Sequence, residues 1–380
     1  MIADELRKRV ALMLKKLKPL PKDYEKDRHF TEFKANDQFP VPELVLFVLR
    51  DVLGLEALGP WEKTRWGVSF EYEEAFFSVS LRKFGFTVTT QVNHPEGSPL
   101  VREVLGKIEK SVRIVEKYLE PFVREQARDG RVTIANRFHH FERTYQFFRA
   151  KAAEVYGPPE SLPAANGQGN EKWLSAELRA PWRAAREGGY YAEAMMNAYF
   201  SRAEHVLVLS LPFLGFEPGG GQLMSFIAEK WSRKIHRLFD FKADPAASSL
   251  YERIRRIRDA LRNPLAHGGF EPGVGSLYFH LPDVAALPAR MTRHGDGFSF
   301  VFNPIGHASF WEICAALDRF DGYLREKLGG GWRWAEAGLD VAYDEQSCRE
   351  YFAAAQSADE LERLIKRVSL RGDYHNNFEY

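Results

Sequence analysis

The stretch Arg262-Asn263-Pro264-Leu265-Ala266-His267 brings a guanidinium and an imidazole together at the end of an expected helix. Asn263 precedes a proline, so it is pushed out of the helical region, and Asn and Pro are preferred where a new helical turn begins. The break can present Arg262 and His267 to one pocket. An imidazole that titrates near neutral pH can exchange a proton with an RNA hydroxyl, while a guanidinium holds phosphate oxygens. The pair therefore predicts RNA cleavage by 2′-hydroxyl attack, without a metal ion or other cofactor.

The helix leading into this motif, residues 250–262, has two distinct faces. Apolar residues at helical spacing form one stripe that we expect to face a core, namely Leu250, Ile254, Ile257 and Leu261. Arg255, Arg258 and Arg262 form a second, cationic stripe. Taken alone, such a stripe is most often a solvated face. Next to Arg262 and His267, it predicts that Arg255 and Arg258 bind RNA.

The spacing of Arg262 and His267 has little specificity by itself, because chance supplies such a pair in a chain rich in arginine. The whole string RNPLAHG, at a helix end in a helical region, resembles the HEPN superfamily, whose motif is Arg-x4–6-His with a polar residue often following the arginine. The resemblance covers roughly residues 171–330. It implies a helical bundle that pairs two-fold, so that two Arg/His sets form one RNA-cleaving cleft.

Carried over residue by residue, the resemblance implies that Arg262 binds the scissile phosphate, that His267 is the acid/base and that Asn263 orients them. Family members also recur in toxin–antitoxin, abortive-infection and other defence systems. We therefore expect a homodimeric endoribonuclease of prokaryotic defence, with an antitoxin or activating partner. A β-hairpin expected between the motif and the last helix departs from the compact bundle of the family.

An acidic residue on an earlier helix sometimes accompanies the motif in this superfamily. Glu204 is the first candidate for that catalytic role and Glu193 the second. The alternative for Glu204 is a salt bridge to a core-facing arginine such as Arg202 or Arg262. The neighbouring His205 is expected on a helix surface.

Two other functions fit the same residues. One is a non-catalytic HEPN-like module that binds RNA or nucleotide, or that serves as a dimerisation scaffold. The other is a helical interaction protein in which Arg262 is salt-bridged and His267 is buried by coincidence. Intact Arg and His side chains favour the enzyme, because a purely structural domain does not need both.

The fold class predicted from the 380 residues is α+β, in several parts. A mixed N-terminal domain over 1–156 combines two short helices, a three-stranded antiparallel meander at 66–92 and a hairpin of long helices at 98–128 and 134–156. A Pro/Gly/Asn-rich linker is expected at 157–170. The HEPN-like domain, 171–330, and a C-terminal appendage, 331–380, complete the chain.

Within the HEPN-like domain we expect helices near 172–187, 190–211, 221–239, 246–262 and 307–328. The segment 276–304 is expected to form the β-hairpin. In the appendage we expect a single short helix at 357–368. The function of the N-terminal domain, which we expect to recognise a trigger, substrate or partner, does not follow from its sequence.

Composition fits a soluble cytoplasmic protein, with 45% hydrophobic and 28% charged residues and a formal net charge of +1. No apolar run is long enough to span a membrane. Cys314 and Cys348 are far apart and predict neither a disulfide scaffold nor a thiolate zinc site. His139-His140 lacks the spacing of a metal-binding pair, so no metal site is expected.

Overall fold

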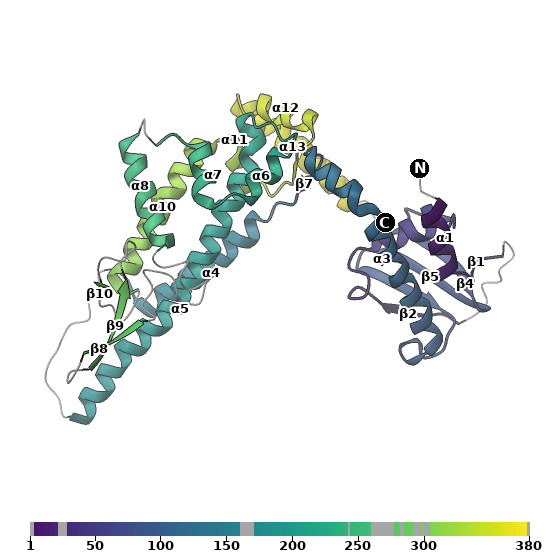
Figure 1. The fold of residues 1–380 in the computed structure, drawn as a ribbon, viewed down its shortest axis with the longest axis horizontal. Coiled ribbons are helices and arrows are strands. Elements are labelled where there is room, and N and C mark those ends of the chain that lie inside the picture. Colours follow the sequence, from purple (N-terminus) through teal and green to yellow (C-terminus); the bar gives the residue numbers. More distant parts are fainter. Residues whose placement is uncertain are drawn as a thin grey trace. The chain divides into compact units, whose positions relative to one another are not determined.

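The computed structural model describes residues 4–21, 29–159, 171–241, 244–259, 277–281, 285–291, 298–299 and 305–377. The described chain is a mixed α+β protein with a small antiparallel sheet, as predicted. It divides into two compact units, Met1–Gln126 with Val368–Tyr380 (unit 1) and Ala127–Arg367 (unit 2), which we describe separately (Figure 1).

The sheet of unit 1 is built on the predicted meander. Its strands β4 (Thr64–Tyr72), β5 (Ala75–Arg82) and β6 (Gly85–Thr90) pair antiparallel, with Phe70 opposite Phe77 and Val79 opposite Val88. The sequence did not predict the short strands β1 (Leu17–Pro19), β2 (Thr31–Lys34) and β3 (Ala57–Leu58). They extend the sheet to the order β1-β4-β5-β6-β2, and β3 also pairs with β4.

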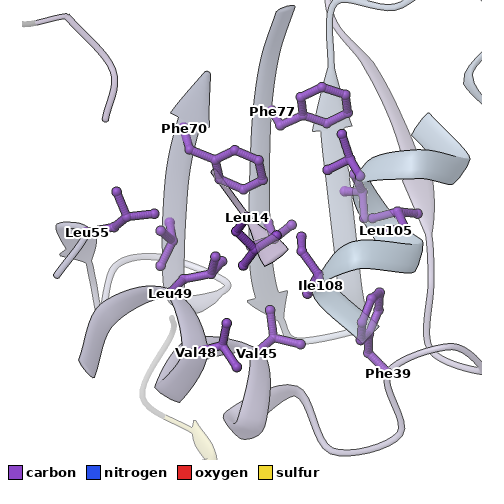
Figure 2. Close-up of a cluster of buried hydrophobic side chains, with 14 of the residues drawn as sticks. Leu14, Phe39, Val45, Val48, Leu49, Leu55, Phe70, Phe77, Leu105 and Ile108 are labelled. Carbon is purple, nitrogen blue, oxygen red and sulfur yellow. The ribbon is translucent and has the colours of Figure 1, made fainter. Parts of the chain in front are cut away.

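One face of this sheet is covered by helices. They are α1 (Asp4–Met13), α2 (Pro42–Leu46) with the π-helical turn η1 (Phe47–Val52), and α3 (Pro99–Arg128), which follows the short helix η2 (Pro95–Gly97). Alternate residues of each strand point toward them and form a single apolar core. Figure 2 shows Phe70 and Phe77 of the sheet facing Leu14, Leu49 and Ile108 from the helical side.

Unit 2 is built around two long helices, α4 (Phe138–Tyr156) and α5 (Glu171–Ser210), which lie side by side (Figure 1). Two helices were expected at 172–187 and 190–211, with a break at Gly188-Gly189, but α5 is continuous. The reason is packing, because a Cβ at Gly188 would lie 2.7 Å from the ring of Tyr156. The glycine permits a close approach of α4 and does not end the helix.

The remaining elements of unit 2 before its C-terminal part are mostly short. After η3 (Leu211–Leu214), the helix expected at 221–239 is two helices, α6 (Gln222–Ala228) and α7 (Trp231–Leu238), because Glu229 and Lys230 adopt extended backbone. α8 (Pro245–Ile257) follows. The expected hairpin has three antiparallel strands, β8 (Leu277–Leu281), β9 (Ala285–Met291) and β10 (Phe298–Ser299). α10 (His307–Leu328) has the predicted bounds.

The last fifty residues differ from the expected appendage with one short helix. They form α11 (Gly330–Glu336), β11 (Val341–Ala342), α12 (Glu345–Ala354) and α13 (Ala358–Asn377). Trp332 and Trp334 of α11 are fully buried, and β11 pairs with β7 (Thr133–Ile134) at the start of unit 2. Apolar burial of the two tryptophans makes this segment, as far as Arg367, part of unit 2.

The division between the units also lies earlier than the boundary expected at 157–170, of which 160–170 fall outside the described residues. Helix α4 was expected to form a hairpin with α3. It belongs instead to unit 2, because its aromatic residues pack on α5, with Tyr145 beside Tyr199 and Phe148 beside Tyr191. Those contacts bring together residues that are distant in sequence.

Candidate functional site

Arg262, Asn263 and His267 lie outside the described residues, so the site is built from the elements that lead to them. Helix α8 is the last described element before the motif in the sequence. Its first turn is fixed by Asp244, whose carboxylate accepts hydrogen bonds from the N–H groups of Ala246 and Ala247, both at 3.0 Å. The motif begins shortly after Asp259, the last described residue of this segment.

The apolar face of α8 differs in part from the predicted stripe. Ile254 and Ile257 are buried as predicted, together with Ala247 and Tyr251, whereas Leu250 is only half-buried and lines a groove. The ring of Tyr251 is stacked on Trp231 of α7, with centroids 6.0 Å apart and planes 12° apart. Helix α8 is therefore held by α7 through aromatic contacts.

Arg255 and Arg258, the two arginines predicted to bind RNA, both already have interaction partners. The guanidinium of Arg255 forms an ion pair with Glu252, 2.5 Å from Nη2 to Oε2, and a second hydrogen bond of 3.1 Å from Nε. The guanidinium carbon of Arg258 lies 5.0 Å from the ring centroid of Trp231, a cation–π contact. Binding of RNA by these two residues would compete with both contacts.

A different pair of arginines on α8, Arg253 and Arg256, faces an open groove of about 920 Å³ between α8 and α10. Arg319, Glu312 and Tyr323 supply the α10 side of the groove. Sequence reasoning missed this face. The signal was present, because Arg253 and Arg256 are also three residues apart on the same helix.

Most charges in the groove are already balanced. Arg253 lies 3.4 Å from Glu312, Glu252 is paired with Arg255 and Asp244 caps the helix. Among the described residues, neither Arg256 nor Arg319 has a carboxylate within the 4.0 Å salt-bridge limit. Their guanidinium groups are the groove's available donors for an anionic ligand, and a phosphate is the anion that such planar donors bind well.

Glu204, the predicted catalytic acid, forms a salt bridge with Lys234 of α7. The ammonium-bearing side chain of Lys234 is only 2% exposed, so it requires a negative partner. The predicted alternative, a salt bridge, is therefore present, although its partner is a lysine and not Arg202 or Arg262. A catalytic role for Glu204 stays a prediction.

Glu193, the second candidate acid, has a different environment. Its carboxyl group is half-buried, and burial raises its pKa above the usual value. The described part of the chain gives it no ion-pair partner. A raised pKa favours the protonated form of Glu193, which is the form that a general acid needs.

Arg202 is the second fully buried charge described in unit 2, at 3% exposed. It bridges Glu142 of α4 and Asp321 of α10, and its guanidinium carbon lies 4.9 Å from the ring centroids of both Tyr145 and Tyr199. Burial raises the pKa of Asp321. The sequence indicated that Arg202 faces a core, but its partners are too distant in sequence to be predicted. This cluster fixes α4, α5 and α10 relative to one another.

His205 was expected on a helix surface and is instead half-buried. Its Nε2 accepts a hydrogen bond of 2.9 Å from the backbone N–H of Arg137, and its ring lies edge-on to Phe141. An accepting nitrogen requires the neutral imidazole. Burial, with a smaller contribution from the charge of Arg137, lowers the pKa of His205. This histidine is a helix-packing residue.

Within the described residues, no group of three His, Cys, Asp or Glu side chains is placed to hold a metal ion. Cys314 and Cys348 are both buried as free thiols. None of the described helices has both the length and the apolar composition needed to cross a membrane. Comparison of the chain with protein families, curated proteins and solved structures finds no match in any of the three.

Proposed function

We propose that this chain is a metal-independent endoribonuclease of the HEPN type. The observation that carries the proposal is the string RNPLAHG, which continues the segment of α8 beyond Asp259. The arginine-lined groove between α8 and α10 supports it, because Arg256 of α8 and Arg319 of α10 offer guanidinium donors for phosphate. In this proposal, an RNA strand binds in the groove.

In the proposed reaction, the 2′-oxygen attacks the adjacent phosphorus as its proton passes to a base, and the bond from phosphorus to the 5′-oxygen breaks. The imidazole of His267 accepts the 2′-hydroxyl proton or donates a proton to the leaving oxygen. The guanidinium of Arg262 binds the non-bridging oxygens as their charge grows, and Asn263 orients the pair. The products are a 2′,3′-cyclic phosphate and a 5′-hydroxyl.

We further propose that the enzyme is a homodimer whose two Arg/His sets share one cleft, and that it acts in prokaryotic defence under the control of an antitoxin or activator. A composite cleft makes a specific prediction. Mixing subunits of Arg262→Ala with subunits of His267→Ala places one intact arginine and one intact histidine in the shared site. Such mixed dimers should regain part of the activity that each variant lacks.

The proposal is tested by incubating the purified full chain with a defined RNA in EDTA and resolving the products on a gel. Wild type should cleave, and both Arg262→Ala and His267→Ala should lose at least about a hundredfold in rate, since each removes a transition-state contact. His140→Ala, which removes an exposed histidine of α4, is the matched control and should cleave like wild type. Terminal phosphate analysis should detect the cyclic product.

Equal cleavage by all four proteins would indicate a contaminating nuclease and would contradict the proposal. RNA binding by wild type without cleavage, including in the presence of cell extract as a source of activator, would instead favour the non-catalytic RNA-binding alternative. A 5′-phosphate on the product would rule out attack by the 2′-hydroxyl.

A further inference from the structure

Unit 1 carries a second surface with chemistry of its own, at one end of its sheet. The turn that precedes β4 and the turn that joins β5 to β6 lie side by side there. The backbone N–H of Lys83 donates a hydrogen bond of 2.9 Å to the carbonyl oxygen of Lys63, and Thr64 is paired with Arg82 across β4 and β5. Side chains from the two turns therefore share one small region.

Two aromatic rings in these turns are exposed. Phe84 is 76% exposed and Trp61 is 46% exposed. The Trp61 ring is held in place by glycines, because a Cβ at Gly67 would lie 3.3 Å from it and a Cβ at Gly59 only 3.1 Å. Exposed aromatic rings that gather in one region are a feature of binding surfaces.

The same turns are rich in cations. Lys63 lies 3.3 Å from Glu62, so its charge is matched. The ammonium group of Lys34, on the neighbouring strand β2, donates to the neutral hydroxyl of Thr87 at 2.8 Å. Among the described residues, neither Lys34 nor Lys83 has a carboxylate within the 4.0 Å salt-bridge limit. Two lysines beside two exposed rings thus give the region an excess of positive charge.

Beside these groups, the sheet face opposite the helices is flat. Two rows of paired residues cross the strands with no large side chain among Gly67, Ser80 and Thr87 in the first row or Ser69, Ser78 and Thr89 in the second. The first row ends at Lys34 and the second at Glu32. Ser80 and Thr87 of the first row are buried, whereas the hydroxyl-bearing side chains of the second row, Ser69, Ser78 and Thr89, are partly exposed.

We propose that this surface, defined by Lys34, Trp61, Lys63, Lys83 and Phe84 (the turn-end surface), binds single-stranded RNA. Bases stack on the two rings, and Lys34 and Lys83 bind phosphates. A duplex fits poorly, because its base faces are covered by neighbouring base pairs. The choice of RNA over DNA rests on the proposed function, whereas the rings and charges argue for a single-stranded nucleic acid independently.

The test measures fluorescence anisotropy of a labelled 20-nucleotide oligouridylate with the full chain carrying His267→Ala, so that the RNA stays intact, as verified on a gel. Adding Trp61→Ala and Phe84→Ala together should weaken binding at least about tenfold, because each stacked base contributes substantially. The control Phe147→Ala removes an aromatic ring of unit 2 whose exposure, 56%, lies between those of Trp61 and Phe84, and it should leave affinity unchanged. If the double variant misfolds, Phe84→Ala alone should still weaken RNA binding, and it should fold because the Phe84 side chain lies largely in solvent.

A second measurement tests the lysines. Lys83→Ala should reduce the slope of log affinity against log salt concentration by about 0.7, the value for one phosphate contact on a single strand. Arg124→Ala, which removes an exposed arginine of α3, is the control and should leave the slope unchanged.

Equal affinity of the ring variants and wild type would overturn the inference, as would equal loss for duplex and single-stranded RNA. Binding to phosphatidylserine vesicles that depends on Trp61 and Phe84, without RNA binding, would overturn it in favour of a membrane surface. The result is separable from the proposed nuclease activity. Loss of RNA binding in the ring variants supports the turn-end surface even if wild type cleaves nothing, and cleavage with unaltered binding contradicts only this inference.

Discussion

The two units of this protein form their interiors from different chemistry. In unit 1 the described buried polar side chains are neutral hydroxyls, such as Ser80, Thr87 and Thr90. In unit 2 they include Arg202, at 3% exposed, and Lys234, at 2% exposed, each bound to carboxylates from other helices. Every fully buried charge among the described residues therefore belongs to the helical unit.

The difference follows from how each architecture specifies which of its elements pack together. In a sheet, backbone hydrogen bonds and the alternation of side chains fix which strands pair and in what register. Helices satisfy their backbone internally, so their mutual arrangement depends on side chains alone. We infer that Arg202 selects α4 and α10 as neighbours of α5, since an unpaired buried charge disfavours other arrangements.

The largest expected effect comes from removing the buried charge of unit 2. Arg202→Ala leaves Glu142 and Asp321 without their cation and should reduce the free energy of unfolding by about 3–5 kcal/mol, measured by urea denaturation. The triple variant that adds Glu142→Gln and Asp321→Asn should recover part of that loss. A cost below about 1 kcal/mol for Arg202→Ala would show that the cluster does not hold the helices together.

A cavity in unit 1 should cost nearly as much, for a different reason. Ile108→Ala removes a fully buried side chain of α3 and should reduce the unfolding free energy by about 3 kcal/mol through lost burial and an unfilled cavity. Since Ile108 lies in the apolar core of unit 1, the cost should be the same at pH 5.5 and pH 7.5. If the cost of Ile108→Ala depended strongly on pH, the proposed difference between the two interiors would be contradicted.

A smaller effect should appear on acidification of unit 2. The pKa of His205 is lowered in the folded protein by burial, so below about pH 6.5 the unfolded chain binds a proton that the folded chain does not. Stability should therefore fall as pH decreases from 6.5 toward the lowered pKa. In His205→Gln, whose amide oxygen can accept the Arg137 N–H, this part of the pH dependence should disappear from thermal unfolding curves.

The smallest effects should come from exposed ion pairs, in both units alike. Glu120→Gln on α3 of unit 1 and Glu345→Gln on α12 of unit 2 each break a pair four residues apart on a helix surface. Each should change the unfolding free energy by less than about 0.5 kcal/mol, because solvent screens the pair. A larger loss in only one unit would mean that surface charges, too, distinguish the units.

Several elements were predictable because their signals are local. The meander of β4, β5 and β6 follows from alternation of apolar residues between short turns, and the bounds of α10 follow from its periodic apolar face and the glycines after it. For the candidate site, the sequence identified the motif at 262–267 and the apolar side of α8 through Ile254 and Ile257. Each of these depends on residues close together in the chain.

Only the tertiary structure decided which charges are available. The sequence could not tell that Arg256 faces the groove toward α10, or that Glu204 neutralises Lys234. It also could not pair α4 with α5 in place of α3. The physical reason is the same in each case. Periodicity defines the faces of a helix, but the partner of a face is set by burial and charge contributed by residues far away in the chain.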